Sequence, residues 1–210
     1  GRVMAAYEAA RDSRRTYGWL APNSGPNSDV HAAWSWLVRR QQDLCDSDGF
    51  TKKAISVIVN NWIGDGITST PEKSTKKYAK NFEDWCDNKL SDFYERTNWY
   101  GLQNLGGRTT ATRGAVIVRR RVNPDLFEKY GLVPLQVQLL EPDWLDFDKD
   151  NGTDIVFGQQ FDSEGRLKGY WIRNQHPGES LLGSSVRINS TFVPKEEISI
   201  HYECLRPGQR

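Results

Sequence analysis

Residues 114–122, GAVIVRRRV, mark the point at which the periodicity of the sequence changes from helical to strand-like. The apolar part of this stretch is rich in β-branched residues, which favours a strand. A second strand is predicted over residues 135–140, where Gln136 and Gln138 are expected to face away from the core. Helical patterns precede the stretch and strand patterns follow it. This order predicts an α+β fold rather than an alternating parallel sheet.

Helices are predicted before this point from apolar residues at three- and four-residue spacing. They cover residues 29–45, residues 51–63, and a third segment that runs to about Asn98, with more helix to Leu105. Side-chain caps are expected from Ser28 or Asp29, from Thr51 and from Ser74. The run Gly64-Asp65-Gly66 should end the second helix. Trp34, Trp62 and Trp85 lie on the apolar faces and are expected in the core.

The second half is expected to be rich in strands. Residues 155–161 and 167–173 flank the turn 162–165, DSEG, and therefore predict a hairpin. Two further short strands are predicted, over residues 186–189 and 198–202.

The chain is therefore divided into an extended arm (residues 1–28), a helical part (29–107) and a β-rich part (108–210), which together form one region. The arm is assigned because residues 11–29 combine arginine with proline, asparagine, serine and glycine and show no sustained apolar period.

The overall charge is balanced, with 28 Lys and Arg against 27 Asp and Glu. No bulk field therefore draws the chain to nucleic acid. The densest apolar stretch, residues 54–63, is interrupted by polar side chains and is shorter than the roughly 20 residues of a spanning helix, so no membrane partner is predicted. Three widely spaced cysteines fit neither a zinc site nor a disulfide framework and favour a reducing compartment.

No motif in the sequence predicts catalytic residues, a metal site or a cofactor. The sequence lacks HExxH, GxSxG, the phosphate-binding loop and a GxGxxG that follows a strand. The acidic residues of the segment 146–154 resemble the start of a calcium loop. However, the glycine, Gly152, comes one place late, and Phe157 stands where a bidentate glutamate is needed. We interpret the segment as a solvated acidic loop.

Two basic segments are candidates for anion contact. The first, residues 106–114, could form a backbone nest for an anion, although a helix-to-strand connection is favoured. In the second, strand geometry places Arg119 and Arg121 on the face shared with Ile117, and Arg120 on the opposite face. Arg119 and Arg121 are the candidate nucleic-acid contacts, although a solvated sheet edge or an ion pair with a neighbour is favoured.

Six stretches, in order along nearly the whole chain, resemble the portal protein of lambda-type tailed bacteriophages. Residues 113–119, RGAVIVR, are similar to the family's GExxxR strand, and residues 138–145, QLLEPDWL, to its QLxExDxL segment. Ala115 stands where the family usually has an acidic residue. The other stretches are the arm with RR and GW, the helix that leads into VNNWIGDGI, the hairpin FDSEGR followed by YWI, and the end IHY followed by RPGQR.

The resemblance implies a structural, non-enzymatic protein. Portal subunits form a ring, usually dodecameric, at one capsid vertex, through which double-stranded DNA is packaged and later ejected. Their partners are the terminase motor, capsid proteins, and head-completion or tail adaptor proteins. The expected location is the virion, and the host cytoplasm during assembly. Portal subunits of this family are longer, so the chain is expected to be an N-terminal, wing-region piece.

Two other readings of the sequence remain open. A stand-alone nucleic-acid-binding module would use the arginines 119–121 and exposed aromatic residues, and would bind with strong salt dependence. A metal-dependent enzyme would be built on residues 146–154 and would show a calcium-dependent melting temperature.

Overall fold

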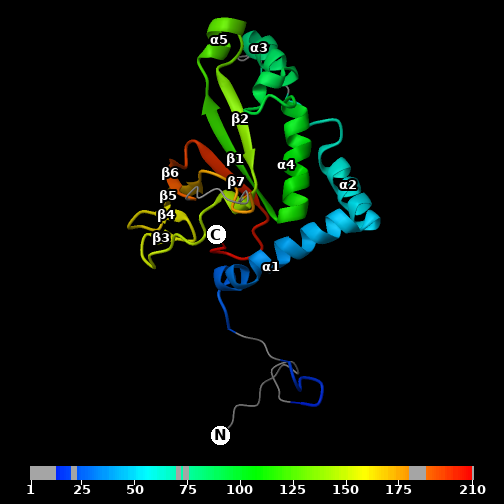
Figure 1. Ribbon diagram of the computed structural model, residues 1–210, viewed down its shortest axis with the longest axis vertical. Coiled ribbons are helices and arrows are strands. Elements are labelled where there is room, and N and C mark those ends of the chain that lie inside the picture. Colours follow the sequence, from blue (N-terminus) through cyan, green and yellow to red (C-terminus); the bar gives the residue numbers. More distant parts are fainter. Residues whose placement is uncertain (1–12, 20–22, 70–71, 73–75, 180–187, 210) are drawn as a thin grey trace. The chain divides into compact units, whose positions relative to one another are not determined.

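The computed structural model describes residues 13–19, 23–69, 72, 76–179 and 188–209 (Figure 1). The chain divides into two compact units, one of Gly1–Ser35 with Leu205–Arg210 and one of Trp36–Cys204. Helices come first and antiparallel sheets second, which confirms the predicted α+β class. Among the described residues, no helix is both long and apolar enough to cross a membrane.

The helices and strands have the following bounds. The helices are α1 (Pro26–Ser47), α2 (Gly49–Ile63), α3 (Lys76–Asp87), α4 (Trp99–Arg113) and α5 (Asp125–Tyr130), with short 3-10 turns η2 (Lys89–Ser91) and η3 (Pro142–Trp144). The strands are β1 (Ala115–Val122), β2 (Leu135–Leu140), β3 (Ile155–Val156), β4 (Gln159–Phe161), β5 (Leu167–Arg173), β6 (Ser190–Pro194) and β7 (Ile198–Tyr202).

The first helix begins earlier than predicted, and the expected cap lies inside it. α1 starts at Pro26, since a proline ring fixes φ near the helical value and its missing N–H is not needed in the first turn. The hydroxyl of Ser28 donates to the carbonyl of Gly25 at 2.9 Å. Ser28 and Asp29 therefore occupy the first turn rather than the cap position. In the unit that contains this turn, Asn27 also donates to the carbonyl of Gly208 at 3.0 Å.

The second helix is capped by Asp48, not by Thr51 as predicted. The Asp48 carboxylate accepts from the backbone N–H of Thr51 at 2.7 Å and from its hydroxyl at 2.6 Å. Gly64 ends the helix with φ 57°, and its N–H donates to the carbonyl of Asn60, so the predicted stop is confirmed.

The predicted third helix is wrong in its extent, because it is broken between α3 and α4. Asp92 lies in the break with 3% of its surface exposed. Its carboxylate accepts from the backbone amides of Tyr94 and Arg96 at 3.0 Å each, which competes with helical hydrogen bonding. Asn98 then caps α4 by accepting from the N–H of Gly101. The predicted cap Ser74 lies outside the described residues.

The glycine-rich segment 106–114 is neither the predicted connection nor an anion nest. Residues 106–113 form the last turns of α4, and only Gly114 leaves the helix, with φ 78°. Gly107 packs close to Ile63, where an added Cβ would lie 3.2 Å from its side chain. Gly107 therefore permits close packing of α4 against α2.

The first sheet, called sheet A, has the strand order β2-β1-β7 and is antiparallel. The register pairs Arg119 with Gln138 and Arg121 with Gln136. Figure 1 shows β1 and β2 side by side, with α4 leading directly into β1. The strands predicted at residues 115–122, 135–140 and 198–202 are confirmed.

The second sheet, sheet B, has the order β3-β4-β5-β6. The predicted hairpin around residues 162–165 is confirmed, as β4 pairs with β5. However, the predicted strand 155–161 is divided into β3 and β4 by a tight turn, in which Phe157 has φ 50° and Gly158 has φ 76°. Near the predicted strand 186–189, the described residues Ile188 and Asn189 are not in a strand, and β6 starts at Ser190.

The core of the second unit lies on both faces of sheet A. One face packs against sheet B through a cluster of buried residues that comprises Ile117, Leu140, Leu145, Tyr170, Ile172, Val193 and Ile198. The other face packs against α3 and α4 through Trp85, Cys86, Leu102 and Val137.

Two predictions about burial need correction. Gln136 and Gln138 are 4% and 5% exposed, because the segment between α3 and α4 covers that part of the sheet. The amide of Gln136 donates to the carbonyl of Leu90 at 3.1 Å. Trp85 is buried as predicted and Trp34 is half-buried, but Trp62 is 56% exposed and does not belong to the core.

Candidate functional site

Arg119 and Arg121 line a cavity of about 460 Å³ between sheets A and B. Both side chains point to the same face of β1 as predicted, whereas Arg120 is exposed and does not line the cavity. The wall is completed by Gln138 of β2, by Tyr94 of the segment before α4, and by Arg173, Asn174 and Thr191 from sheet B and the residue that follows β5. Polar groups from segments far apart in the sequence therefore line the cavity.

Arg119 is one of two cavity cations whose side chains are largely buried, and Arg173 is the other. The Arg119 side chain is 16% exposed, and its Nη2 lies 3.9 Å from Oε2 of Glu197, which is a long ion pair. Its Nε is buried and has no hydrogen-bond partner among the described residues. Burial lowers the pKa of Arg119, and the neighbouring Arg121 lowers it further. Arg119 is thus a largely buried cation with incomplete compensation.

Arg121 is held in place by uncharged partners. Its Nε donates to Oε1 of Gln138 at 3.1 Å, and its guanidinium lies 5.1 Å from the centre of the Phe93 ring. The Gln138 amide in turn donates to the hydroxyl of Tyr94 at 2.9 Å. These contacts orient the guanidinium without neutralising its charge.

Arg173 differs, because carboxylates of the acidic loop neutralise it. Its Nη2 lies 3.1 Å from Oδ1 of Asp146 and 2.7 Å from Oδ2 of Asp148. Two of the alternating carboxylates that resembled a calcium loop therefore bind an arginine of β5.

The remaining polar groups of the acidic loop hydrogen-bond within the loop. Asp150 accepts from the N–H of Gly152 at 2.7 Å, and the Asn151 amide donates to Asp154 at 2.7 Å. The bond from Asn151 is the main reason why the pKa of Asp154 is lowered. This pattern is that of successive Asx turns on an exposed loop.

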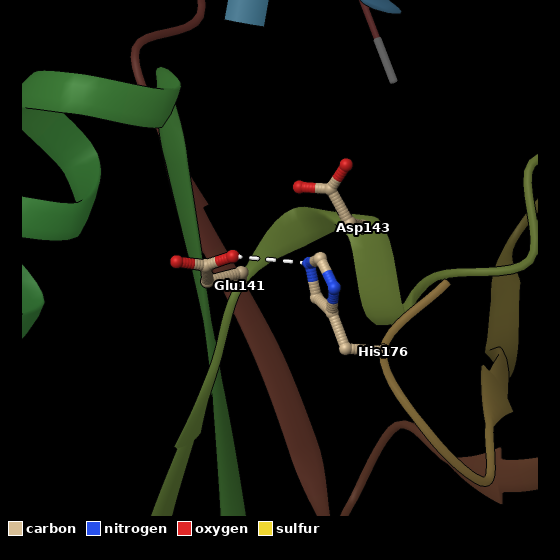
Figure 2. A group of neighbouring side chains, drawn as sticks. All are labelled: Glu141, Asp143 and His176. Atoms are coloured by element: carbon tan, nitrogen blue, oxygen red, sulfur yellow. Dashed lines mark ion pairs between the residues drawn. The ribbon is translucent and has the colours of Figure 1, made fainter. Parts of the chain in front are cut away.

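A second polar cluster contains Glu141, Asp143 and His176 (Figure 2). One potential metal-ligand atom of each residue lies within 4.8 Å of the others. His176 Nε2 is 3.2 Å from Oε2 of Glu141. Arg113, however, lies 3.1 Å from Glu141 and 3.2 Å from Asp143, so a cation already bridges the two carboxylates. The cluster is best described as an ion-pair network.

Sequence reasoning missed this network, although a signal for it existed. Arg113 precedes β1 and Glu141 follows β2 directly. Since the two strands are antiparallel, the start of one lies beside the end of the other, as the pairing of Ile117 with Leu140 indicates. A cation before one strand and acids after its partner therefore predict an ion pair.

Comparison with known protein families identifies the class of protein. The family described as phage portal protein, lambda family, matches residues 12–210. The chain belongs to this portal protein family. The resemblance stated from sequence is thus confirmed, and it places the portal protein among structural, DNA-packaging components of bacteriophages. The search of curated proteins gave no significant match.

The ion-pair network of Arg113, Glu141, Asp143 and His176 connects two of the six stretches that resemble the portal family. It joins the segments 113–119 and 138–145. Arg113 lies at the head of the first motif and both carboxylates lie in the second. The network therefore fixes the end of α4 to the turn after β2.

Proposed function

We propose that the chain is a non-enzymatic subunit of a portal ring, expected to be dodecameric, through which viral DNA is packaged and ejected. The observation that carries the proposal is the family match over residues 12–210. The proposed partners are the terminase motor, capsid proteins, head-completion or tail adaptor proteins, and double-stranded DNA. The proposed location is the portal vertex of the virion, after assembly in the host cytoplasm.

Exposed apolar side chains on α1 and α2 support contacts between copies. Trp36 is 62% exposed, Phe50 89% and Trp62 56%. Exposed large aromatic residues are enriched at protein interfaces and are costly to leave in water. We call the exposed apolar residues of these helices the α1–α2 surface: Trp36, Leu37, Leu44, Phe50, Val57, Ile58 and Trp62. A closed ring needs such a surface on every subunit, facing a complementary surface on the next.

The amino-terminal arm is proposed as a second element that reaches a neighbouring subunit. Its described residues form a turn in which the N–H of Thr16 donates to the carbonyl of Ser13. Tyr17 is 93% exposed and Trp19 is 66% exposed. Deletion of the arm should weaken ring assembly, and unchanged assembly would remove the arm from the proposal.

The balanced charge of the chain fits a DNA conduit. The formal net charge is +1 over 210 residues. Each phosphate that a protein neutralises adds affinity and a steeper dependence on salt. Walls that are close to neutral would let DNA slide, as packaging requires. The wing-like region composed of the arm, the helical part and the β-rich part is proposed to form such a wall.

The test is the solution mass of the protein with its natural ends, measured by light scattering. The proposal predicts a large closed ring with a single subunit number. A monomer at high concentration that binds DNA in a salt-sensitive manner would contradict it. That outcome would favour the second candidate, a stand-alone nucleic-acid-binding module, which draws its support from the incompletely neutralised Arg119 and Arg121.

A further inference from the structure

The cavity between sheets A and B carries more positive charge than its walls neutralise. Arg173 is paired with Asp146 and Asp148, so its charge is balanced. Among the described residues, Arg119 has only the long ion pair with Glu197, and Arg121 contacts the uncharged side chains of Gln138 and Phe93. A cavity with this imbalance attracts an anion.

The geometry points to a binding site for a single phosphate group in this cavity, with Arg119 and Arg121 as the charged ligands. Two guanidinium groups from one face of β1 present several N–H donors to the same space. A phosphate dianion offers enough charge to balance both cations, whereas one carboxylate balances only one. The phosphate group can belong to a free phosphate compound or to a DNA backbone.

The buried Nε of Arg119 is the strongest single indication. A buried polar group without a partner is costly, and such groups are rare in folded proteins. If the charge of Arg119 served stability alone, a closer ion pair would be expected. The partner carboxylate, that of Glu197, is instead 48% exposed and 3.9 Å away. An incoming anion supplies the missing acceptor. The arrangement of Arg119 therefore serves a ligand rather than the fold.

Uncharged donors around the cavity complete the site. The Tyr94 hydroxyl accepts from Gln138 and so retains its own hydrogen for donation. The side-chain oxygen of Asn174 accepts from the N–H of Asn189, which leaves its amide hydrogens available. Thr191 lines the same cavity. Donors therefore approach the space from β1, from the segment before α4 and from Asn174, directly after β5.

The experiment is a calorimetric titration of inorganic phosphate into the protein with its natural ends, at constant ionic strength set with sodium chloride. Arg119→Gln and Arg121→Gln should each weaken phosphate binding by about tenfold, because each removes a charge-assisted contact. The matched control is Arg120→Gln, which makes the same charge change at an exposed position whose side chain points to the opposite face of β1, and which should leave affinity unchanged. Glu197→Gln should tighten binding, since it removes the competing carboxylate.

A parallel titration with a short DNA duplex distinguishes the two sources. Loss of duplex binding in the same two variants, but not in Arg120→Gln, assigns the site to a backbone phosphate. Binding of inorganic phosphate alone assigns it to a free phosphate compound. Both results support the site. The absence of saturable phosphate binding to the unaltered protein, measured also by phosphorus NMR, would overturn it, as would an equal loss in Arg120→Gln.

The melting temperature distinguishes a ligand-binding role of Arg119 from a structural role. Without phosphate, Arg119→Met should melt at the same temperature as the unaltered protein or higher, because it removes a largely buried and incompletely paired charge. A marked fall in melting temperature would assign Arg119 to the fold and contradict the proposal. The inference is independent of ring formation, since solution mass and phosphate binding are measured separately.

Discussion

Helices α1 and α2 and the strands of sheet A both carry apolar residues at regular spacing, yet they bury them very differently. The described buried residues of the two helices are Val38, Ile55 and Val59. The shorter strands β1 and β2 bury Ala115, Val116, Ile117, Val137 and Leu140, together with two glutamines. Periodicity therefore indicates which face of an element is apolar, but not whether the same chain covers that face. In this portal protein, the sheets complete their own core and the α1–α2 surface is proposed to be covered by another copy.

The largest expected effect is a difference in unfolding free energy between alanine substitutions of an isoleucine in sheet A and an isoleucine in α2. Ile117→Ala should cost about 4 kcal/mol of unfolding free energy, because Ile117 is 0% exposed between the two sheets. Ile58→Ala on α2 should cost about 1 kcal/mol or less before assembly, since Ile58 is 39% exposed. Urea denaturation of the unassembled protein measures both. Equal losses would contradict the contrast between the regions.

Glycine-to-alanine substitutions should show the same difference between the sheets and helix α2. At Gly158, a Cβ would lie 2.6 Å from the carbonyl oxygen of Asp146, and φ is +76°. Gly158→Ala should therefore cost about 3 kcal/mol. Gly49, at the start of α2, has open space around it, and Gly49→Ala should be neutral or stabilise by up to about 1 kcal/mol. Thermal unfolding measures the pair, and a stable Gly158→Ala variant would show that the turn adapts.

The ion-pair network should contribute less than the apolar core. Arg113→Met leaves Glu141 and Asp143 without their cation and should cost about 2 kcal/mol, because the Arg113 side chain is only 14% exposed. The exposed pair Lys129–Asp125 on α5 is the control, and Lys129→Met should leave the urea midpoint unchanged. A midpoint for Arg113→Met that equals that of the control would remove the network from the account.

The smallest expected effect concerns the cap of α2. The hydroxyl and the N–H of Thr51 lower the pKa of Asp48 from its ordinary value of 3.8. A lowered folded-state pKa contributes stability above the ordinary value, and this contribution is lost as the pH falls through the folded value. Asp48→Ala should therefore melt at a lower temperature than the unaltered protein at neutral pH, and the gap should close in acid below the ordinary value. The control is Asp43→Ala, at an exposed position of α1. A gap that does not change with pH would contradict the capping role.

Features that depend on local sequence were predicted well. The α+β order, strands β1, β2 and β7, the hairpin at residues 162–165 and the stop at Gly64 follow from periodicity, β-branching and turn residues. The strand alternation also placed Arg119 and Arg121 on one face. These features are set by residues close together in the chain, so one sequence is enough to find them.

Features that depend on distant partners were missed. Gln136 and Gln138 are buried because the segment around Asp92 covers them, and alternation cannot reveal that cover. The break between α3 and α4 depends on a buried carboxylate that competes with the helix. Tyr94 and Arg173 join the cavity of Arg119 only through the fold, so the complete site could not be listed from sequence.

The most direct test of the central claim is hydrogen–deuterium exchange of the protein with its natural ends, in assembled and unassembled form. Assembly should slow exchange in α2 and in the second half of α1, where the α1–α2 surface lies. Exchange in β1 and β2 should hardly change, because their core is complete in a single chain. A ring in which α2 exchanges as fast as in the unassembled protein would contradict the claim that other copies cover this surface.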